Sequence, residues 1–306
     1  MPSTAGLAAA ALVATGLVVA GPSSTALAGT DPDLGADPTV TADALPTVQI
    51  DGVVWSQVVV GNTVYVAGDF TTARPAGAAP GTQTVPRSNL LAYDIATGQL
   101  VESWAPSTNG VVHAIAASPD GSQIFVGGAF NRVNNVGRSR FAALSASTGA
   151  VLSSFSAGTN GEVRGIAVAP DAVYITGTFN TVGGQSRARV ASFTPSGTLR
   201  GWSANVQSRI SYDIATSPDG SRVFIGGAFE KVNNVPRLGT AALSGATGAL
   251  LPWDVSDEVY SWGPDAAVTS VNADESNVYF TSMAFLDDAT GWTNTEGAFA
   301  ADQATG

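Results

Sequence analysis

Few side chains in this sequence have the type and spacing that catalysis or metal binding requires. The single histidine, His113, lies in the alternating segment VVHAIA, and the spacing offers it neither a Ser-His-Asp triad nor a set of metal ligands. Asp120 and Asp219 belong to SPDG segments without the Asp-x-Asp spacing and trailing Glu of a calcium loop. We therefore expect a strand histidine and two turn-forming aspartates, and we predict no catalytic residue, cofactor-binding residue or metal ligand.

Two other features could bind charged groups. The acidic residues Asp254, Asp257 and Glu258 form a weak candidate for a cation site. Glycine-rich segments such as FVGGAF would suit a phosphate only if a helix followed, because the helix N-terminus supplies the N–H donors. No such helix is indicated, so we expect no nucleotide or other cofactor.

Four arginines occupy one position of a repeated pattern. They are Arg87, Arg138, Arg187 and Arg237. The last three follow the second glycine of their own segment by ten residues, and Arg87 follows an inserted loop at Ala76–Thr84. These arginines could line a pocket for an anionic ligand. Their recurrence favours instead a structural role, in which the rigid fork of donors braces backbone carbonyls between neighbouring units.

The elements that must position these residues form a repeat of about fifty residues. A strand-like segment recurs as VYVAGDF at 64–70, IFVGGAF at 124–130, VYITGTF at 173–179, VFIGGAF at 223–229 and the degenerate VYFTSMAF at 278–285. A glycine turn keeps the same period, at Gly98, Gly149, Gly197, Gly248 and Gly306. Two markers in phase predict a repeat architecture.

Each repeat divides into four predicted strands. In the second copy these are VVHAIAAS, IFVGGAF, RFAALSA and VLSSFSA, and no segment after position 48 shows a helical period. We predict an all-β β-propeller of four-stranded blades, centred near 64–104, 111–157, 163–204, 210–255 and 267–306. The fifth blade is predicted to be truncated. Alternatively, residues 49–60 supply an outer strand that completes it.

Several residues hold fixed places in the repeat, and we expect them to be structural. The glycines, predicted to permit close packing of blades near the axis, are Gly68, Gly128, Gly177 and Gly227 with the preceding Gly127 and Gly226. The phenylalanines, predicted to fill the space between blades, are Phe70, Phe130, Phe179, Phe229 and Phe285. The aromatic residues of the fourth strand are Trp104, Phe155, Trp202 and Trp253.

Composition limits the possible partners. The chain has 306 residues, no cysteine and a net charge of -11, with 44% hydrophobic and only 12% charged residues. The negative charge would repel phosphate backbones and anionic headgroups, so we expect no nucleic-acid partner. Without cysteine, neither disulfides nor thiolate metal sites can form.

The N-terminal segment predicts export. Residues 5–21 are apolar but too short and too rich in Ala and Gly for a membrane span, and Ala26-Leu27-Ala28 offers a cleavage site. We predict a signal peptide at 1–28, although its start lacks Lys and Arg, and the alternative is an uncleaved anchor or apolar tail. Residues 29–48 predict a flexible linker rich in Pro, Asp and Thr. The propeller is then assigned to 49–306, with no membrane partner after cleavage.

The segment VFIGGAFEKVNNVPRLGTAALSGATGAL at 223–250 resembles an uncharacterised propeller repeat of large secreted proteins from high-GC Gram-positive bacteria. The resemblance extends over residues 50–306. It implies a propeller fold and a secreted or cell-wall location, and it supplies no catalytic residue. A weaker likeness, carried by LAYDIATGQLVESW at 91–104, is to quinone-dehydrogenase-type propellers, and more loosely to WD and kelch-like propellers.

Three functions stay open from the sequence. We expect a secreted, non-enzymatic binding or scaffold module that recognises a glycan, a wall polymer or a protein through loops at one end of the ring, with Ala76–Thr84 as the main loop. One alternative is a secreted enzyme of the quinone-dependent dehydrogenase or polysaccharide lyase or hydrolase type. That alternative requires polar and charged side chains converging on the centre. The other is a purely structural surface stalk.

Overall fold

The computed structural model describes residues 47–260, 266–283, 285–288, 291–294 and 297–306. The predicted signal peptide and nearly all of the predicted linker lie outside these residues. Within them, every regular element except the four-residue helix α1 (Val255–Glu258) is a strand. The prediction of an all-β chain is therefore confirmed.

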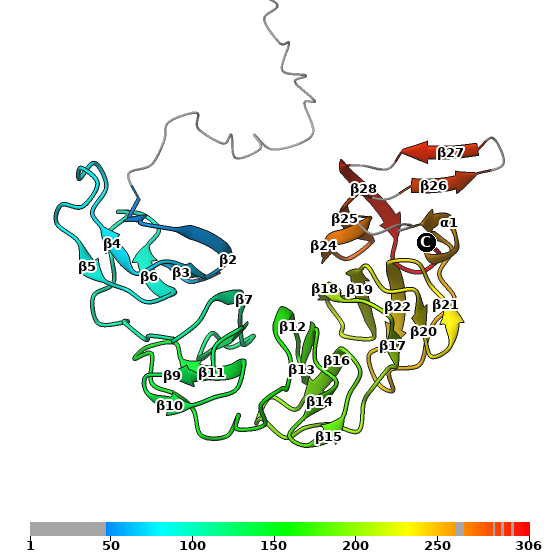
Figure 1. Ribbon diagram of the computed structural model, residues 1–306, viewed down its shortest axis with the longest axis horizontal. Coiled ribbons are helices and arrows are strands. Elements are labelled where there is room, and N and C mark those ends of the chain that lie inside the picture. Colours follow the sequence, from blue (N-terminus) through cyan, green and yellow to red (C-terminus); the bar gives the residue numbers. More distant parts are fainter. Residues whose placement is uncertain (1–46, 261–265, 284, 289–290, 295–296) are drawn as a thin grey trace, which may run out of the picture. The chain divides into compact units, whose positions relative to one another are not determined.

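Five antiparallel sheets of three strands each follow one another along the chain, and we call them the first to fifth repeat sheets (Figure 1). The first contains β2 (Val53–Val60), β3 (Thr63–Asp69) and β6 (Leu90–Asp94), and the second β7 (Val112–Ala117), β8 (Gln123–Gly128) and β11 (Phe141–Ser145). The third contains β12 (Val163–Ala169), β13 (Ala172–Gly177) and β16 (Val190–Phe193), and the fourth β18 (Ser211–Thr216), β19 (Arg222–Gly227) and β22 (Thr240–Ser244). The fifth contains β24 (Ala267–Ala273), β25 (Asn277–Met283) and β28 (Gly297–Asp302). In each sheet the second strand is central.

The predicted fourth strand is much shorter than expected. In the first four repeats it is reduced to a single bridged residue, through the pairs Tyr93 with Leu100, Leu144 with Val151, Phe193 with Leu199 and Leu243 with Leu250. The pairing ends because the chain then turns. At Trp104, for example, the backbone N–H donates to the carbonyl of Val101. That turn carries the aromatic side chain toward the next repeat sheet.

Short side hairpins, which the sequence analysis missed, accompany the repeat sheets. They are β4 (Thr72–Arg74) with β5 (Val85–Pro86), β9 (Arg132–Val133) with β10 (Val136–Gly137), β14 (Thr181–Val182) with β15 (Gln185–Ser186), β20 (Lys231–Val232) with β21 (Val235–Pro236), and β26 (Phe285–Asp288) with β27 (Gly291–Asn294). Three are extended by β1 (Gln49–Ile50), β17 (Val206–Gln207) and β23 (Val259–Tyr260). Three turn through two residues of positive φ, namely Asn134–Asn135, Gly183–Gly184 and Asn233–Asn234. In the first hairpin the inserted loop replaces this turn.

The pairing of residues 49–60 answers one question left open by the sequence. Gln49 and Ile50 pair with β4, and β2 pairs with β3 in the first repeat sheet. In the described structure this segment therefore belongs to the first repeat, so the alternative that it completes the last blade is not supported by the observed pairing.

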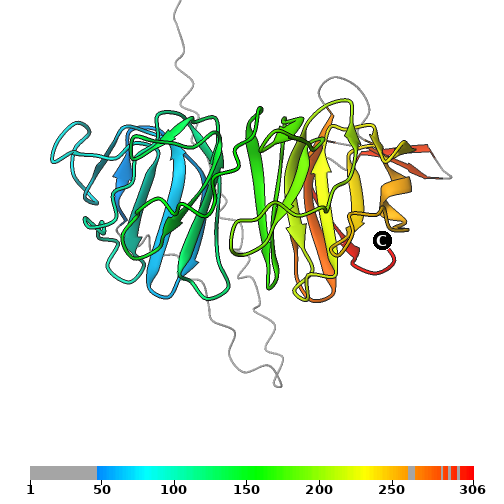
Figure 2. The same ribbon diagram turned by 90° about the horizontal axis from the view of Figure 1, so that it is seen from below.

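The first strands β2, β7, β12, β18 and β24 lie innermost in Figure 1, and each packs against the next along the chain. Figure 2 shows the sheets from the side, with their long strands running in similar directions. The apolar core lies between consecutive sheets: one cluster joins Tyr65, Trp104 and Phe130, and equivalent clusters contain Phe179 and Phe229. Phe70 is buried in a separate cluster on the first sheet.

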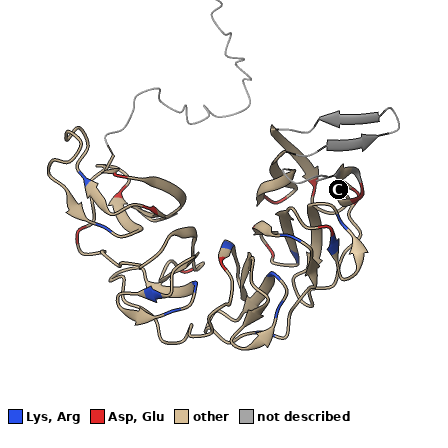
Figure 3. Cartoon of the chain, in the orientation of Figure 1, with Lys and Arg blue, Asp and Glu red and all other residues tan. Residues whose placement is uncertain are grey.

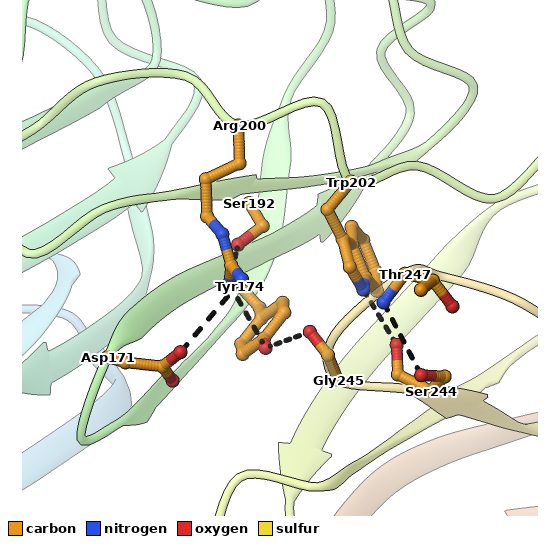
Figure 4. Close-up of polar contacts among 8 residues, drawn as sticks. All are labelled: Asp171, Tyr174, Ser192, Arg200, Trp202, Ser244, Gly245 and Thr247. Carbon is orange, nitrogen blue, oxygen red and sulfur yellow. Dashed lines mark hydrogen bonds and ion pairs between the residues drawn. The ribbon is translucent and has the colours of Figure 1, made fainter.

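Indole and phenol groups join neighbouring repeats at the sheet edges. The indole N–H of Trp202 donates a hydrogen bond to the carbonyl of Ser244 at 2.8 Å, and the hydroxyl of Tyr174 donates to the carbonyl of Gly245 at 2.9 Å (Figure 4). Trp104 and Tyr65 make the same two bonds to Ser145 and Ala146, at 3.2 and 2.9 Å. Trp253 donates to Asp302 at 2.9 Å. Each of these tryptophans thus fixes one repeat to the third strand of the next.

Candidate functional site

Every innermost strand contains a one-residue β-bulge at the same point of the repeat. The register shifts between Val54 and Ser56, Val112 and Ala114, Val163 and Gly165, Ser211 and Asp213, and Val268 and Ser270. The bulged residues are therefore Trp55, His113, Arg164, Tyr212 and Thr269. A bulge places an extra residue in the strand and re-aims its side chain, and bulges are frequent beside active sites.

Repeated glycines lie opposite four of the five bulges, and their contacts show how the bulged strand is accommodated. A Cβ atom on Gly128 would overlap the carbonyl oxygen of Val111, which precedes the bulge in the neighbouring strand. Gly68, Gly177 and Gly227 are placed in the same way against the carbonyls of Val53, Glu162 and Ile210, respectively. The expectation that these second glycines permit packing between blades therefore needs correction, because the group they accommodate belongs to their own sheet. In four repeats the absence of a side chain leaves room for this carbonyl, whereas in the fifth repeat the equivalent residue opposite the bulged strand is Ser282.

In the two Gly-Gly pairs, the first glycine permits close packing of neighbouring sheets, which is the role that the sequence analysis expected of both glycines. A Cβ atom on Gly127 would overlap the side chain of Val163 in β12, and one on Gly226 would meet Val268 and Val271 in β24. These two glycines therefore allow the next repeat sheet to approach closely.

All five bulged residues line one cavity of about 490 Å³. Its other lining residues are Ser56, Ala114, Ile115, Ile166, Asp213 and Ser270. Trp55 is the most open of the large side chains, with 57% of its surface exposed, and its ring lies 6.2 Å from that of His113. The volume falls within the range of about 300–1,000 Å³ that is typical of small-molecule sites.

The five positions are equivalent in the backbone but carry five different side chains. The framework residues around them recur from repeat to repeat, as the glycines and aromatic residues show. Since the fold itself would accept one residue type at each bulge, their divergence points to a role other than folding. Sequence reasoning missed this set, except for His113. The available signal was a bulky or polar residue followed by a small one inside each first strand, as in VVWSQVVV and EVRGIAV.

His113 is half-buried in the cavity and faces an ion pair. Its Nε2 lies 3.6 Å from Oε2 of Glu162, which also accepts a hydrogen bond from Arg164. Burial lowers the pKa of His113 below its usual 6.5, and the positive charge of Arg164 lowers it further. The negative charges of Glu162 and Asp69 act in the opposite direction but do not cancel the shift. The imidazole is therefore neutral at pH 7, and Glu162 compensates the charge of Arg164.

Asp213 follows the fourth bulge and connects two innermost strands. Its Oδ2 accepts hydrogen bonds from the N–H of Val271 at 2.9 Å and the hydroxyl of Ser270 at 3.1 Å, both in β24. Its Oδ1 accepts from the N–H of Ile214 at 2.9 Å. Burial raises the pKa of this carboxyl, and the three hydrogen bonds oppose the shift without cancelling it.

The repeated arginines lie away from this cavity. Arg187 donates to the carbonyls of Ser186 and Arg200, at 2.7 and 2.9 Å, within its own repeat. Arg87 and Arg138 make equivalent bonds, to Pro86 and Glu102 and to Gly137 and Leu152. The expected bracing of carbonyls is present, but it joins two parts of one repeat instead of two neighbouring repeats. Arg237 departs from the pattern, since it donates to Pro236 and to the carboxylate of Asp257 at 2.6 Å.

The contacts between repeats come from residues two positions further on, which the sequence analysis missed. Arg189 donates to the carbonyls of Val206 and Ser208, at 2.7 and 2.9 Å, and Arg140 donates to Thr159 at 3.0 Å. Asn89 donates in the same manner to Gly110 at 2.9 Å. The R-x-R spacing in two repeats was the available signal.

Three of the acidic residues singled out from the sequence, Asp120, Asp219 and Asp257, have local partners. Hydrogen bonds from the hydroxyl of Ser118, and then from Ser122, lower the pKa of Asp120 to about 2. Asp219 accepts equivalent bonds from Ser217 and Ser221. Asp257 pairs with Arg237. In the part of the chain that the structure describes, no three acidic or histidine side chains gather in a way that could hold a metal ion.

A second cavity, of about 430 Å³, lies beside the inserted loop. Two segments of the first repeat line it. One contributes Arg74, Pro75, Ala76 and Gln83, and the other contributes residues 97–100 and Glu102. Arg74 is held by the loop, because its Nε donates to the carbonyl of Ala78 at 3.2 Å. The loop predicted from the sequence thus borders a hollow of its own.

Comparison with known families gives one match. Residues 172–199, which include β13 and β16 of the third repeat sheet, match the model described as "Domain of unknown function (DUF5122) beta-propeller". This short match, together with the many small antiparallel sheets, supports an uncharacterised β-propeller domain family. The curated proteins give no match. Among the described residues, no helix has the length and apolar character needed to span a membrane.

Proposed function

We propose that this chain is a secreted binding module in which five repeat sheets serve as propeller blades and the bulged residues bind a polar ligand. Each bridged segment after the glycine turn would be the fourth strand of its blade. The signal-like N-terminus supports secretion. The finer resemblance, to repeats of secreted or cell-wall proteins of Gram-positive bacteria, is part of the same proposal.

One observation carries the binding function: five equivalent bulges present five different side chains to one cavity of about 490 Å³. A purely structural stalk would have no need for this divergence. The cavity also contains aromatic, hydroxyl and charged groups, the mixture that orients a small polar ligand. Contacts by the inserted loop at 76–84 with a wall polymer or a protein remain compatible with this site.

The exposed indole of Trp55 provides the test. Its N–H signal in an NMR spectrum, assigned with Trp55→Phe, is followed during titration with a panel of neutral oligosaccharides, spermidine, citrate and glycerol phosphate. We expect at least one compound to shift this signal, while the indole signals of Trp104 and Trp202 stay in place because both are buried and bonded to carbonyls. A panel that leaves Trp55 unchanged would contradict the proposed site.

An enzyme acting through the same cavity is the second candidate. The observation in its favour is the carboxyl of Asp213, whose pKa is raised by burial and which lines the same cavity as the neutral His113. A lyase or hydrolase would release new chain ends from a bound polysaccharide, and Asp213→Asn would abolish the release. Binding without any release, measured over a day by reducing-end assay and by absorbance of unsaturated products, favours the binding module.

A further inference from the structure

Trp55 differs from Trp104, Trp202 and Trp253 in its surroundings. Trp104, Trp202 and Trp253 are 1–3% exposed and donate to carbonyls of the next repeat, whereas Trp55 is 57% exposed and lines the cavity. Neighbouring Val53 and Val54 are also exposed, at 48% and 44%. The indole thus offers an apolar surface that the fold leaves open to solvent, next to a hollow lined with polar groups.

The polar groups of the cavity are mostly hydroxyls. Ser56, Tyr212, Thr269 and Ser270 line it together with the carboxyl of Asp213. Hydroxyl groups can both donate and accept, so they match a ligand that carries several hydroxyls of its own. Ala114, Ile115 and Ile166 add apolar surface.

The charges of the cavity exclude attraction of an anion. Arg164 lines the cavity but is paired with Glu162, and His113 is neutral because burial lowers its pKa. Asp213 also lines the cavity, and its carboxyl supplies no positive charge that could attract an anion. Figure 3 shows acidic and basic residues interspersed along the described residues, and the full sequence carries a net charge of -11. A phosphate-bearing or uronate polymer would therefore bind against an unfavourable potential.

From these observations we infer that the ligand is a neutral saccharide, whose ring stacks on Trp55 while its hydroxyls bond to the polar residues of the bulges. A sugar ring combines an apolar C–H face with a polar edge, which is the combination that the indole and the hydroxyl groups present. The inference rests on the proposed function and specifies its ligand class.

The test compares uncharged and acidic saccharides of similar length. Oligomers of glucose, mannose and N-acetylglucosamine are titrated into the wild-type chain alongside oligogalacturonate, and binding is measured by isothermal titration calorimetry, which needs no signal from Trp55. We expect at least one uncharged series to bind with a Kd in the millimolar range or tighter, on the order of 1 mM, as single stacked sugar sites allow, and oligogalacturonate to bind at least about 10-fold more weakly.

Variants locate the contact. Trp55→Ala should weaken binding at least about 10-fold, whereas Trp55→Phe, which keeps a ring, should lose less. Val59→Ala is the matched control, because Val59 lies in the same strand, is 52% exposed and does not line the cavity, and it should bind as the wild type does. Circular dichroism confirms that all three variants are folded.

The outcomes separate this inference from the proposed function. If citrate, spermidine or oligogalacturonate affects Trp55 and no uncharged saccharide does, the inference is wrong and the binding site stands. If nothing affects Trp55, both are wrong. Equal saccharide binding by Trp55→Ala and the wild type would also overturn the inference, because the sugar would then lie elsewhere.

Discussion

At the scale of single residues, the glycines and the bulged residues depend on each other. In four repeats a glycine leaves room for a carbonyl of the neighbouring strand, and the bulge that follows that carbonyl turns a variable side chain toward the cavity. The recurring residue is thus structural, and the residue that it helps to position differs between repeats.

Gly128→Ala tests this dependence. Because the new Cβ atom would overlap the carbonyl oxygen of Val111, we expect the free energy of unfolding to fall by about 2–4 kcal/mol. Gly137→Ala is the control, since no atom lies within 4 Å of its Cβ position, and it should change stability by less than about 0.5 kcal/mol. Urea unfolding measures both. Equal losses in the two variants would show that the space beside Val111 is not restricted.

The raised pKa of Asp213 predicts a pH dependence. Burial favours the protonated carboxyl in the folded state, so the folded pKa lies above the unfolded value of 3.8. The carboxyl therefore destabilises the folded chain progressively as pH rises from about 3.8 through the folded pKa, and the penalty is constant above it. His113, Arg164 and Tyr212 line the same cavity, and their contributions are common to the wild type and the variant.

Urea unfolding of the wild type and Asp213→Asn at several pH values checks this sign. The stability of the variant relative to the wild type should increase between pH 3.8 and the folded pKa of Asp213, and then level off. A relative stability that decreases with rising pH would mean that the ionised carboxyl stabilises the fold through its bonds to β24.

At the scale of elements, the strands of each repeat were predictable, while their ends were not. The second copy was predicted as four strands, and three of them are observed as β7, β8 and β11 within one or two residues. The fourth failed as a strand because its aromatic residue must leave the sheet to reach the next one, a demand that alternation does not reveal. The side hairpins were missed since each strand is only two to four residues long.

The bulges were missed for a related reason. A one-residue insertion barely alters an alternating pattern, so the sequence analysis placed His113 in a regular strand and did not group it with Trp55 or Tyr212. Only the pairing register shows that these residues share one position. In contrast, the recurrence of Gly, Phe, Trp and Arg was visible in the sequence, because close packing or a hydrogen bond to a backbone carbonyl restricts the residue type at each of these positions.

The tyrosine contacts between repeats give a prediction at this scale. Tyr174→Phe removes the 2.9 Å bond to Gly245 but keeps the ring, and the second and fourth repeats carry Phe125 and Phe224 at the equivalent place. We expect a loss of about 1 kcal/mol in the free energy of unfolding, measured in urea. Tyr279→Phe is the comparison for an exposed hydroxyl: the residue is 44% exposed, water can replace its 2.6 Å bond to Asp274, and the loss should be smaller. No loss in Tyr174→Phe would mean that this bond does not stabilise the junction.

At the scale of the whole molecule, the framework residues recur from repeat to repeat, whereas the side chains of the cavity differ between repeats. The all-β architecture followed from a period of about fifty residues, and the family match agrees with it. The site could not be predicted in the same way, because its members lie on five different repeats and become neighbours only when the innermost strands pack together.

The most direct test replaces four bulged residues by threonine, the residue of the fifth bulge. The variant carries Trp55→Thr, His113→Thr, Arg164→Thr and Tyr212→Thr. Urea unfolding is measured with and without the compound that binds the wild type best, at ten times its Kd. The ligand should stabilise the wild type by about 1.4 kcal/mol and the variant not at all, while the unliganded variant stays within about 2 kcal/mol of the wild type.

Ligand stabilisation that persists in the variant would contradict the account, because binding would then not involve the bulged residues. A loss of more than about 4 kcal/mol without ligand would contradict it as well, since it would show that these side chains maintain the fold.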